Sequence, residues 1–429
     1  MPHFNLDIFS RKFPIRKKFD LNLFIKLLNK LGSPYLRLPP TIHVAGTNGK
    51  GSTIAFLRAI FESAGYKVHV YSSPHLIRVN ERIIIAGKEI ETSYFMHLVH
   101  TCEEYAKYFK ELTWFELITA VGFLAYAENF ADVLLLETGV GGRLDATNVI
   151  NNPLVTAITP ISYDHMSYLG KSLSEIAYAK AGIFKTGTPA FSTVQFKEAA
   201  QTLVKCAKDL SIPFFLEGQD WNIQENQGKL IYNSNLTCTD ISLKGKHQFQ
   251  NAGLALSIAS FLQNIFKLNE IHLKQGIASA IWKGRLQNMT STFLMNYLVK
   301  GSEIWLDSAH NEGGARALIE SVRNWKFLPT YFIVGMLNHK DPQGFLLILS
   351  ELAQRFYFIP ILTSENHVLP EEFIKIISQK DGFIASSVID ALEKIAKFSS
   401  SPVRVIICGS VYLAGDVLNM VENQDEKTS

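Results

Sequence analysis

Residues 43–53 form the segment of this chain best suited to chemistry, because they combine glycines, a lysine and hydroxyl side chains. The segment reads HVAGTNGKGST and continues an apolar run that predicts a buried strand. Backbone N–H groups in such a turn, with the N-terminus of the next helix, can hold phosphates, and a lysine adds a point charge. The strict G-x-x-x-x-G-K-[ST] pattern is not met, since Val44 stands at its first glycine and Gly51 separates Lys50 from Ser52. The glycines and the lysine still lie between a strand and a helix, so we predict an ATP site.

Three more polar residues stand at or just after the ends of apolar runs that predict strands: Ser73, Glu137 and His165. Open α/β sheets bind their ligands at the carboxyl ends of parallel strands. Taken alone, a glutamate or a histidine at such a position is often structural or solvated. Beside a phosphate loop, Glu137 is better interpreted as a hard ligand for Mg²⁺, with Ser73 able to reach the same ion.

Lys180 lies in AYAKAGIFK, an apolar and alanine-rich helical segment. Most lysines in such a place extend their ammonium group to solvent. Held near a metal site, Lys180 would instead have a lowered pKa and could react as the free amine.

A second strand-end loop occurs in the C-terminal half, where EIWLD leads into DSAHN. Asp307 and His310 are therefore predicted to face a ligand crevice. A second domain that carries these groups could close over the ATP site. The exclusion of water by such closure suits a reactive phosphorylated intermediate.

Apolar runs that alternate with helical periods predict an α/β fold with parallel sheets. The first domain is predicted as a P-loop-type doubly wound sheet over residues 1–287, with strands at 41–45, 67–71, 131–137 and 154–160. Helical patterns cover about 92–110 and 115–129, and a polar, β-like stretch at 217–243 indicates a small hairpin insertion. A smaller Rossmann-like domain is expected over 293–421, after a boundary at 286–292 and before a polar tail at 422–429. Its strands are predicted at 303–307, 330–335, 355–361 and 402–409.

Composition excludes several classes of protein. The chain has 429 residues, of which 47% are hydrophobic and 19% charged, so two domains can each bury a core. The net charge of +3 is too small to indicate a nucleic-acid partner. The longest near-apolar stretch, 117–127, is far short of the ~20 residues that span a bilayer. The basic segment from residue 11 continues into an amphipathic helix, not a signal peptide. Four cysteines without CxxC spacing indicate reduced thiols in a cytoplasmic protein.

Eleven segments together resemble the folylpolyglutamate synthase/dihydrofolate synthase family, within the Mur-ligase group of ATP-dependent amide-forming enzymes. They occur in the order of that family across residues about 20–417. The segments are HVAGTNGKGST, SSPHLIRVNERI, LTWFELIT, ETGVGGRLDATN, DHMSYLG, AKAGIFK, HQFQNAGLAL, KGRLQ, DSAHNEGGARAL, GMLNHKD and ICGSVYLAGDV.

The resemblance implies roles for particular residues. ATP would be held by Thr47, Asn48, Gly49, Lys50, Gly51, Ser52, Asn251, Arg285, Asp307 and His310. One Mg²⁺ would be bound by Ser73 and Glu137, and a second by His165 and by Lys180 in its N-carboxylated (carbamylated) form. The pterin part of the substrate would lie near Thr113, Trp114, Phe115 and Asp145. Lys50, His165 and Lys180 would be the catalytic residues.

The chain departs from the family pattern in three loops. Met166 and Ser167 follow His165 where Thr-Asp is usual, Glu312 stands where Pro is usual, and Asn338-His339 precede Lys340-Asp341. None of these changes removes a predicted metal or phosphate ligand.

The implied reaction begins with transfer of the γ-phosphoryl group of ATP to a carboxylate, because a carboxylate at neutral pH is a poor electrophile. The amine of L-glutamate then attacks the acyl phosphate. The acceptor is dihydropteroate, a folate or both, and the intact GRLDATN string favours both. The expected partners are small molecules, without nucleic acid or membrane, and the expected state is a monomer.

Three alternatives remain at this stage. One is an enzyme that only extends the folate tail. Another is a Mur-type ligase for UDP-linked precursors, which the ~45 residues before the phosphate loop disfavour, since such enzymes carry a sizeable UDP-binding domain there. The third is a nucleotide-dependent switch without synthetic activity, which the presence of Lys50, Glu137, His165 and Lys180 together disfavours.

Overall fold

The computed structural model describes residues 20–109, 111–377 and 382–428. The start of the predicted first domain and of the basic segment, residues 1–19, lies outside the described part, as does residue 110 at the end of a predicted helix. The described residues form two compact units. One contains residues 20–74, 78–242 and 249–281, and the other 75–77, 243–248 and 282–428. This division falls shortly before the boundary expected at 286–292, and the domain limits 1–287 and 293–421 stay predictions.

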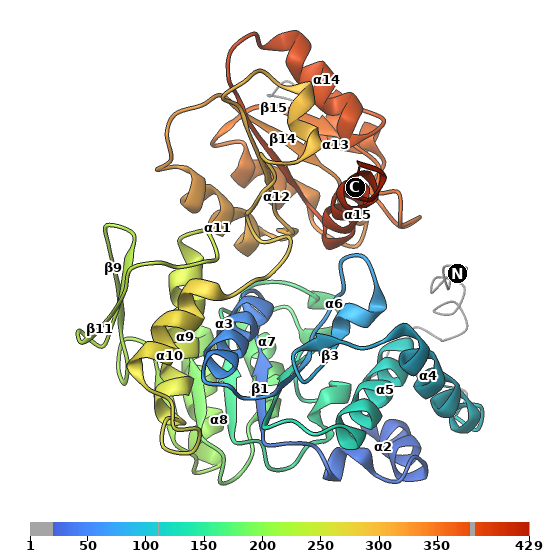
Figure 1. Cartoon of the computed structure of the whole chain (residues 1–429), viewed down its shortest axis with the longest axis vertical. Helices are drawn as coiled ribbons and strands as arrows, with labels where there is room; N and C mark the ends of the chain where they lie inside the picture. The colour runs from blue at the N-terminus through green and yellow to red at the C-terminus, as the bar shows by residue number, and fades with distance from the viewer. Residues whose placement is uncertain (1–19, 110, 378–381, 429) are drawn as a thin grey trace. The chain divides into compact units, whose positions relative to one another are not determined.

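An eight-stranded sheet forms the centre of the first unit, in the order β4-β3-β2-β5-β1-β6-β7-β8. Figure 1 labels two of its strands, β1 and β3. All its neighbours are parallel except β3 and β4, which form antiparallel pairs at one edge. Strand β1 lies between β5 and β6, so the chain winds away from it in both directions. The predicted strands are confirmed as β1 (Thr41–Ala45), β2 (Val68–Tyr71), β5 (Val133–Glu137) and β6 (Val155–Ile158), and the others are β3 (Ile83–Ile85), β4 (Lys88–Glu89), β7 (Ala190–Ser192) and β8 (Phe214–Leu216).

Every residue of β1, β5 and β6 is buried, which explains why their sequences are continuous apolar runs without alternation. The parallel register places His43 of β1 beside Leu136 of β5 and Thr156 of β6. These three side chains therefore point to the same face of the sheet.

Helices cover this sheet and shape its binding edge. Helix α5 packs against α4, and α3 packs against α10 (Figure 1). A second cluster on the face of His43 joins Ala45 and Ile158 to α7 and α8. The helices of this unit are α2 (Leu21–Lys30), α3 (Lys50–Ser63), α4 (Thr92–Ala106), α5 (Trp114–Glu128), α6 (Met166–Leu169), α7 (Leu173–Lys180), α8 (Lys197–Asp209), α9 (His247–Phe261) and α10 (Glu270–Ser279), with 3-10 turns η1 (Pro34–Leu36), η2 (Val79–Arg82), η3 (Ala146–Val149) and η4 (Ala181–Ile183).

The insertion expected at 217–243 is a three-stranded antiparallel sheet. Its strands are β9 (Ile223–Asn226), β10 (Lys229–Tyr232) and β11 (Leu236–Cys238). The predicted hairpin is thus present, and β11 adds a third strand to it.

The second unit has a six-stranded sheet in the order β12-β13-β17-β14-β15-β16. It is parallel except for β12, which pairs antiparallel with β13. The strands are β12 (Gln287–Asn288), β13 (Glu303–Leu306), β14 (Thr330–Val334), β15 (Ala353–Phe358), β16 (Gly382–Ile384) and β17 (Arg404–Cys408). The helical segments are η5 (Phe293–Tyr297), α11 (Glu312–Val322), α12 (Pro342–Leu349), α13 (Pro370–Ile376), α14 (Val388–Phe398) and α15 (Val411–Thr428).

The residues expected to form a polar tail from 422 continue helix α15 as far as Thr428. The apolar residues in the first part of this helix belong to the core of the second unit, and the helix continues through the polar residues that follow. Among the helices that the structure describes, none is both long and apolar enough to cross a membrane.

Candidate active site

The phosphate loop joins the end of β1 to the start of α3. Gly49 caps α3 with φ of 88°, and Gly46 has φ of 151°, a region that L side chains rarely adopt. A Cβ at Gly46 would overlap the Thr159 side chain, and one at Gly49 would overlap the amide of Asn251. Both glycines are therefore required for this path. The 14-residue helix α3 begins directly after Gly49, so its positive N-terminal end faces the loop.

Thr47 and Asn48 clamp this loop to the segment that follows β6. Their backbone N–H groups donate to the Pro160 carbonyl at 3.0 and 3.3 Å. The Thr47 hydroxyl donates to the Ser162 carbonyl and accepts from the Ser162 N–H, both at 3.1 Å. The two predicted phosphate contacts thus also have a structural task that the sequence pattern did not reveal.

Lys50 and Glu137 meet at the ends of neighbouring strands. Lys50 Nζ lies 3.9 Å from Glu137 Oε1 and donates to the carbonyls of Gly46 and Thr47 at 3.3 and 3.2 Å. The other carboxylate oxygen, Oε2, accepts from the Ser73 backbone N–H at 3.2 Å. The structure therefore brings Ser73, Glu137 and Lys50 together, as the strand-end pattern predicted.

Lys180 extends from the last turn of α7 to the same loop. Its Nζ is buried and donates to the Gly46 carbonyl at 2.6 Å. Burial, and then the nearby charge of Lys50, lower the pKa of Lys180 to about 7, although Asp164 and Asp145 oppose this shift. A substantial fraction of Lys180 is therefore an uncharged amine near neutral pH.

His165 stands just before α6 with φ of 50°, an uncommon conformation for a residue other than glycine. Its Nε2 lies 3.9 Å from Asp164 Oδ1, and its backbone N–H donates to the same oxygen at 2.8 Å. Asp164 is also one of the charges that act on Lys180. Among the described residues, no cluster of three or more His, Cys, Asp and Glu side chains could hold a metal. The predicted ligand sets are of another kind, because they include a serine and a lysine carbamate.

The segment predicted to contact the acceptor begins α5. Thr113 caps this helix, since its hydroxyl accepts from the Glu116 N–H at 3.2 Å and donates to the Glu116 carboxylate at 2.8 Å. The ring of Phe115 packs so closely on Gly139 that a Cβ there would overlap it. The guanidinium carbon of Arg82 lies 4.7 Å from the centre of the Trp114 ring.

Sequence reasoning missed Arg82. This arginine is only 6% exposed, and a buried arginine normally has partners or a function. Its position in SSPHLIRVNERI shows no pattern that predicts burial, so the contact with Trp114 was visible only in the fold.

Asp145 is buried within the loop that follows β5. Its Oδ2 accepts from the Val140 N–H at 2.8 Å, and its Oδ1 accepts from the N–H and the hydroxyl of Thr147 at 3.0 and 2.6 Å. Burial raises the pKa of Asp145, and these hydrogen bonds oppose the shift. The carboxylate therefore organises the loop in addition to any contact with a substrate.

The second unit gathers Arg285, Asp307 and His310 around the end of β13. Asp307 accepts from the N–H groups of Leu286 and Ala309, both at 2.7 Å, which fixes the chain next to Arg285. His310 Nδ1 lies 2.9 Å from the Ser308 carbonyl, so this nitrogen carries the proton. The three predicted nucleotide contacts are thus neighbours within this unit.

Comparisons with known proteins match most of the chain. Residues 44–259 match the model of the Mur ligase middle domain, and residues 294–420 match that of the dihydrofolate synthetase C-terminal domain. The Bacillus subtilis protein named dihydrofolate synthase/folylpolyglutamate synthase is 32% identical over 420 residues, which cover 91% of this chain and 92% of that protein. The chain belongs to the dihydrofolate synthase/folylpolyglutamate synthase family of Mur ligases. It is therefore an ATP-dependent amide-forming ligase, and the resemblance found in the sequence is confirmed.

Solved structures of this family have the same fold. Escherichia coli FolC in complex with DHPP and ADP superposes with a TM-score of 0.86 at 28% identity, over 98% of this chain and 97% of that one. The Mycobacterium tuberculosis folylpolyglutamate synthase with ADP and AMPPCP also gives 0.86, at 27% identity over 97% of both chains. The predicted α/β class with parallel sheets is thereby confirmed.

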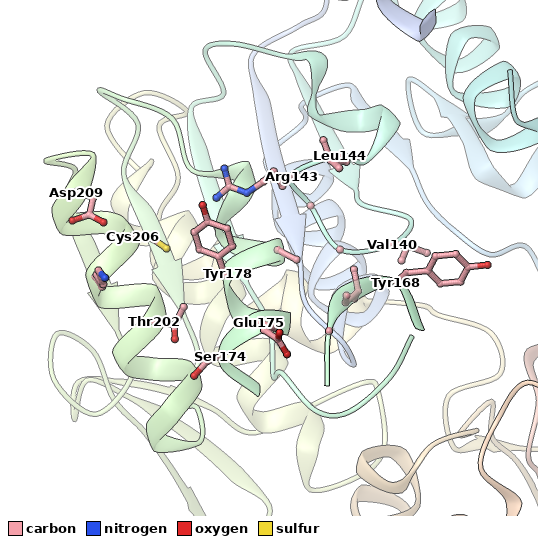
Figure 2. Close-up of a pocket in the computed structure, with 16 residues that line it drawn as sticks. Val140, Arg143, Leu144, Tyr168, Ser174, Glu175, Tyr178, Thr202, Cys206 and Asp209 are labelled. Atoms are coloured by element: carbon pink, nitrogen blue, oxygen red, sulfur yellow. The ribbon is translucent and has the colours of Figure 1, made fainter. Parts of the chain in front are cut away.

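The ligase also has a cavity of about 800 Å³ beside this site. Figure 2 shows Arg143 next to Tyr178, and the guanidinium carbon lies 4.2 Å from the ring centre. The walls come from loop 140–144 and from α6, α7 and α8. Asp145 directly follows this loop, His165 directly precedes α6, and Lys180 ends α7. None of the predicted site residues lines the cavity.

Proposed function

We propose that this ligase joins L-glutamate to dihydropteroate, which makes dihydrofolate, and to the γ-carboxyl group of folates, which extends the glutamate tail. The observation that carries the proposal is that Lys50 and Lys180 both donate to the Gly46 carbonyl just after β1, while Glu137 Oε1 lies 3.9 Å from Lys50 Nζ. A phosphate loop and an acidic side chain suited to metal binding thus lie next to each other. The α5 segment 113–115 and the loop after β5 supply the neighbouring acceptor site.

The first step transfers the γ-phosphoryl group of ATP to the acceptor carboxylate and releases ADP. Two anions must approach each other for this reaction, so positive charge is needed where they meet. Lys50 supplies such a charge on the phosphate loop. Arg285, Asp307 and His310 of the second unit are proposed to contact the nucleotide, together with Asn251 next to Gly49.

We propose that the site holds two Mg²⁺ ions. Glu137 offers a buried carboxylate and Ser73 a hydroxyl for one ion, and His165 with a carbamate on Lys180 would hold the other. When bound, Mg²⁺ offsets the charge of the phosphates and the acceptor carboxylate. A bifunctional relative has been solved with Mn, AMPPNP and L-glutamate bound, which supports a divalent cation in this family.

The lowered pKa of Lys180 supports the carbamate. The free amine attacks CO2, a nitrogen–carbon bond forms, and the nitrogen loses a proton to solvent. The product is an anionic oxygen ligand in place of a buried cation. An unmodified lysine in a well-ordered active site, with full activity in Lys180→Arg, would disprove this part of the proposal.

In the second step the amine of L-glutamate attacks the acyl phosphate. The tetrahedral intermediate collapses to the amide and inorganic phosphate, and one proton is released overall. The intact GRLDATN string, with Asp145 buried in it, supports both acceptors. The relatives carry either name or both: the Lacticaseibacillus casei protein is named folylpolyglutamate synthase and the Saccharomyces cerevisiae protein dihydrofolate synthetase.

The test is glutamate-dependent phosphate release with ATP and Mg²⁺, run in parallel with dihydropteroate and with tetrahydrofolate. Turnover with both acceptors is expected, and Lys50→Met should abolish it. Lys88→Met, on the exposed edge strand β4, is the matched control and should retain activity. Turnover with one acceptor would restrict the function to that reaction, and none with either, while ATP still binds, would favour a nucleotide-binding switch.

We further propose a monomer in the cytoplasm that acts on small molecules without nucleic acid. The four cysteines are free thiols, which agrees with a reducing compartment. A single species near 48 kDa in light scattering is the expected result for the monomer.

A further inference from the structure

A buried chain of hydrogen bonds connects the phosphate-binding strand β1 to the loop after β5. His43, in the middle of β1, has its Nε2 2.9 Å from Thr147 Oγ1. The same hydroxyl lies 2.6 Å from Asp145 Oδ1. His43 and Thr147 are fully buried and Asp145 is nearly so, with 5% of its surface exposed.

The chemistry of the three side chains determines which group donates and which accepts in each hydrogen bond. A threonine hydroxyl has one hydrogen, and an ionised carboxylate only accepts. Thr147 therefore donates to Asp145 and accepts from a protonated His43 Nε2. Burial, followed by the charge of Lys185, lowers the pKa of His43 to about 3, so the ring is neutral. With the proton on Nε2, the Nδ1 atom carries no hydrogen. In agreement, Nδ1 has no hydrogen-bond partner among the described residues.

Asp145 connects these hydrogen bonds to the backbone of the loop after β5. Its carboxylate accepts from the backbone N–H groups of Val140 and Thr147, which folds residues 139–147 back on themselves. Gly139, the first residue of this loop, packs on the ring of Phe115. The position of Asp145 therefore decides where the loop backbone lies next to Phe115.

We propose that His43 and Thr147 are positioning residues, which fix the acceptor-binding loop 139–147 to the strand that carries the phosphate loop. The inference rests on the proposed function, in which this loop and the 113–115 segment bind the acceptor. Phosphoryl transfer requires the acceptor carboxylate to stay within about 3–3.5 Å of the γ-phosphorus and in line with it. A dry chain of directed hydrogen bonds holds that distance better than exposed contacts would, because each donor polarises the next and water cannot replace it.

Thr147→Val tests the chain, because valine keeps the shape of threonine and removes the hydroxyl. Thr147→Ser keeps the hydroxyl and serves as the rescue variant. Thr156→Val is the matched control: Thr156 lies beside His43 on β6, is fully buried, and its hydroxyl has no partner among the described residues. This control removes a buried hydroxyl from the same face without breaking the chain.

We expect Thr147→Val to raise the KM for dihydropteroate or tetrahydrofolate at least tenfold, with the KM for ATP changed less than twofold. Thr147→Ser should stay within threefold of the natural protein, and Thr156→Val should match it. A merely structural role for Thr147 would lower the thermal midpoint and the amount of active enzyme but leave the acceptor KM unchanged. That second pattern would overturn the proposal.

The ¹⁵N NMR spectrum of the histidine rings provides an independent readout, with His43 assigned by its loss in His43→Gln. A protonated Nε2 and a bare Nδ1 are expected, and Thr147→Val should shift both signals. A protonated Nδ1 would show that His43 does not donate to Thr147, and the proposed series of hydrogen bonds would be refuted. Absence of turnover in the natural protein would refute the proposed function and the positioning role together, whereas turnover with an unchanged acceptor KM in Thr147→Val would refute only the positioning role.

Discussion

Replacement of His43 by glutamine should make the N-terminal unit less sensitive to acid. The pKa of His43 is lowered from its ordinary value of 6.5 to about 3, first by burial and then by Lys185. The unfolded chain therefore binds a proton below about pH 6.5 that the folded chain does not bind until about pH 3. Because the folded pKa is depressed, the stability from this group is fully present above pH 6.5 and is lost as the pH falls.

The size of the effect follows from the same two values. A pH of about 4.5 is two units below the pKa of His43 in the unfolded chain, so that histidine is protonated there. In the folded protein His43 is still neutral at this pH. Each unit corresponds to about 1.4 kcal/mol, so the natural protein should lose about 3 kcal/mol of unfolding free energy from His43 between pH 7.5 and 4.5. A glutamine does not titrate. Between pH 7.5 and 4.5 the free energy of unfolding should therefore fall less in His43→Gln than in the natural protein, and the two losses should differ by this amount.

Hydrogen exchange under native conditions measures this difference at peptides that cover β1 and β5. This readout gives the opening free energy of the unit without the assumption that both units unfold together. His97→Gln, at an exposed position of α4, is the control and should follow the natural protein. Equal acid losses in the natural protein and in His43→Gln would show that His43 is not buried in neutral form, and the reasoning would fail.

Three further outcomes are expected. Gly49→Ala should weaken ATP binding at least tenfold in calorimetry, because φ of 88° disfavours a side chain and the new Cβ would displace Asn251; unchanged affinity would contradict the geometry of the loop. Gly139→Ala should raise the acceptor KM more than the ATP KM in the phosphate-release assay, because its Cβ would push on Phe115, and a selective effect on ATP would argue against an acceptor site there. A maleimide should label no more than one thiol in the native protein and four after denaturation, as counted by mass spectrometry, since only Cys206 is partly exposed; fast labelling of a second thiol would contradict the described burial.

The central strands and the main helices were predictable because local patterns determine them. TIHVA and VLLLE are apolar without alternation, as strands covered on both faces must be, and they became β1 and β5. The strands that were not predicted, such as β12 and β16, have two or three residues at the edge of a sheet. They exist because a longer neighbour offers unpaired backbone groups, and no local pattern of two residues can indicate that.

The sequence by itself determined the ends of the strands, and with them the phosphate loop and the meeting of Lys50 with Glu137, since parallel strands bring their carboxyl ends to one edge. Only the tertiary structure decided which buried polar groups pair. His43 and Thr147 are 104 residues apart, and Arg82 lies over Trp114 from another segment. The lowered pKa of Lys180 likewise requires burial beside Lys50, which comes from a different helix. Such contacts depend on packing between distant segments, and packing follows from the whole fold, so no spacing of residue types along the chain could have shown them.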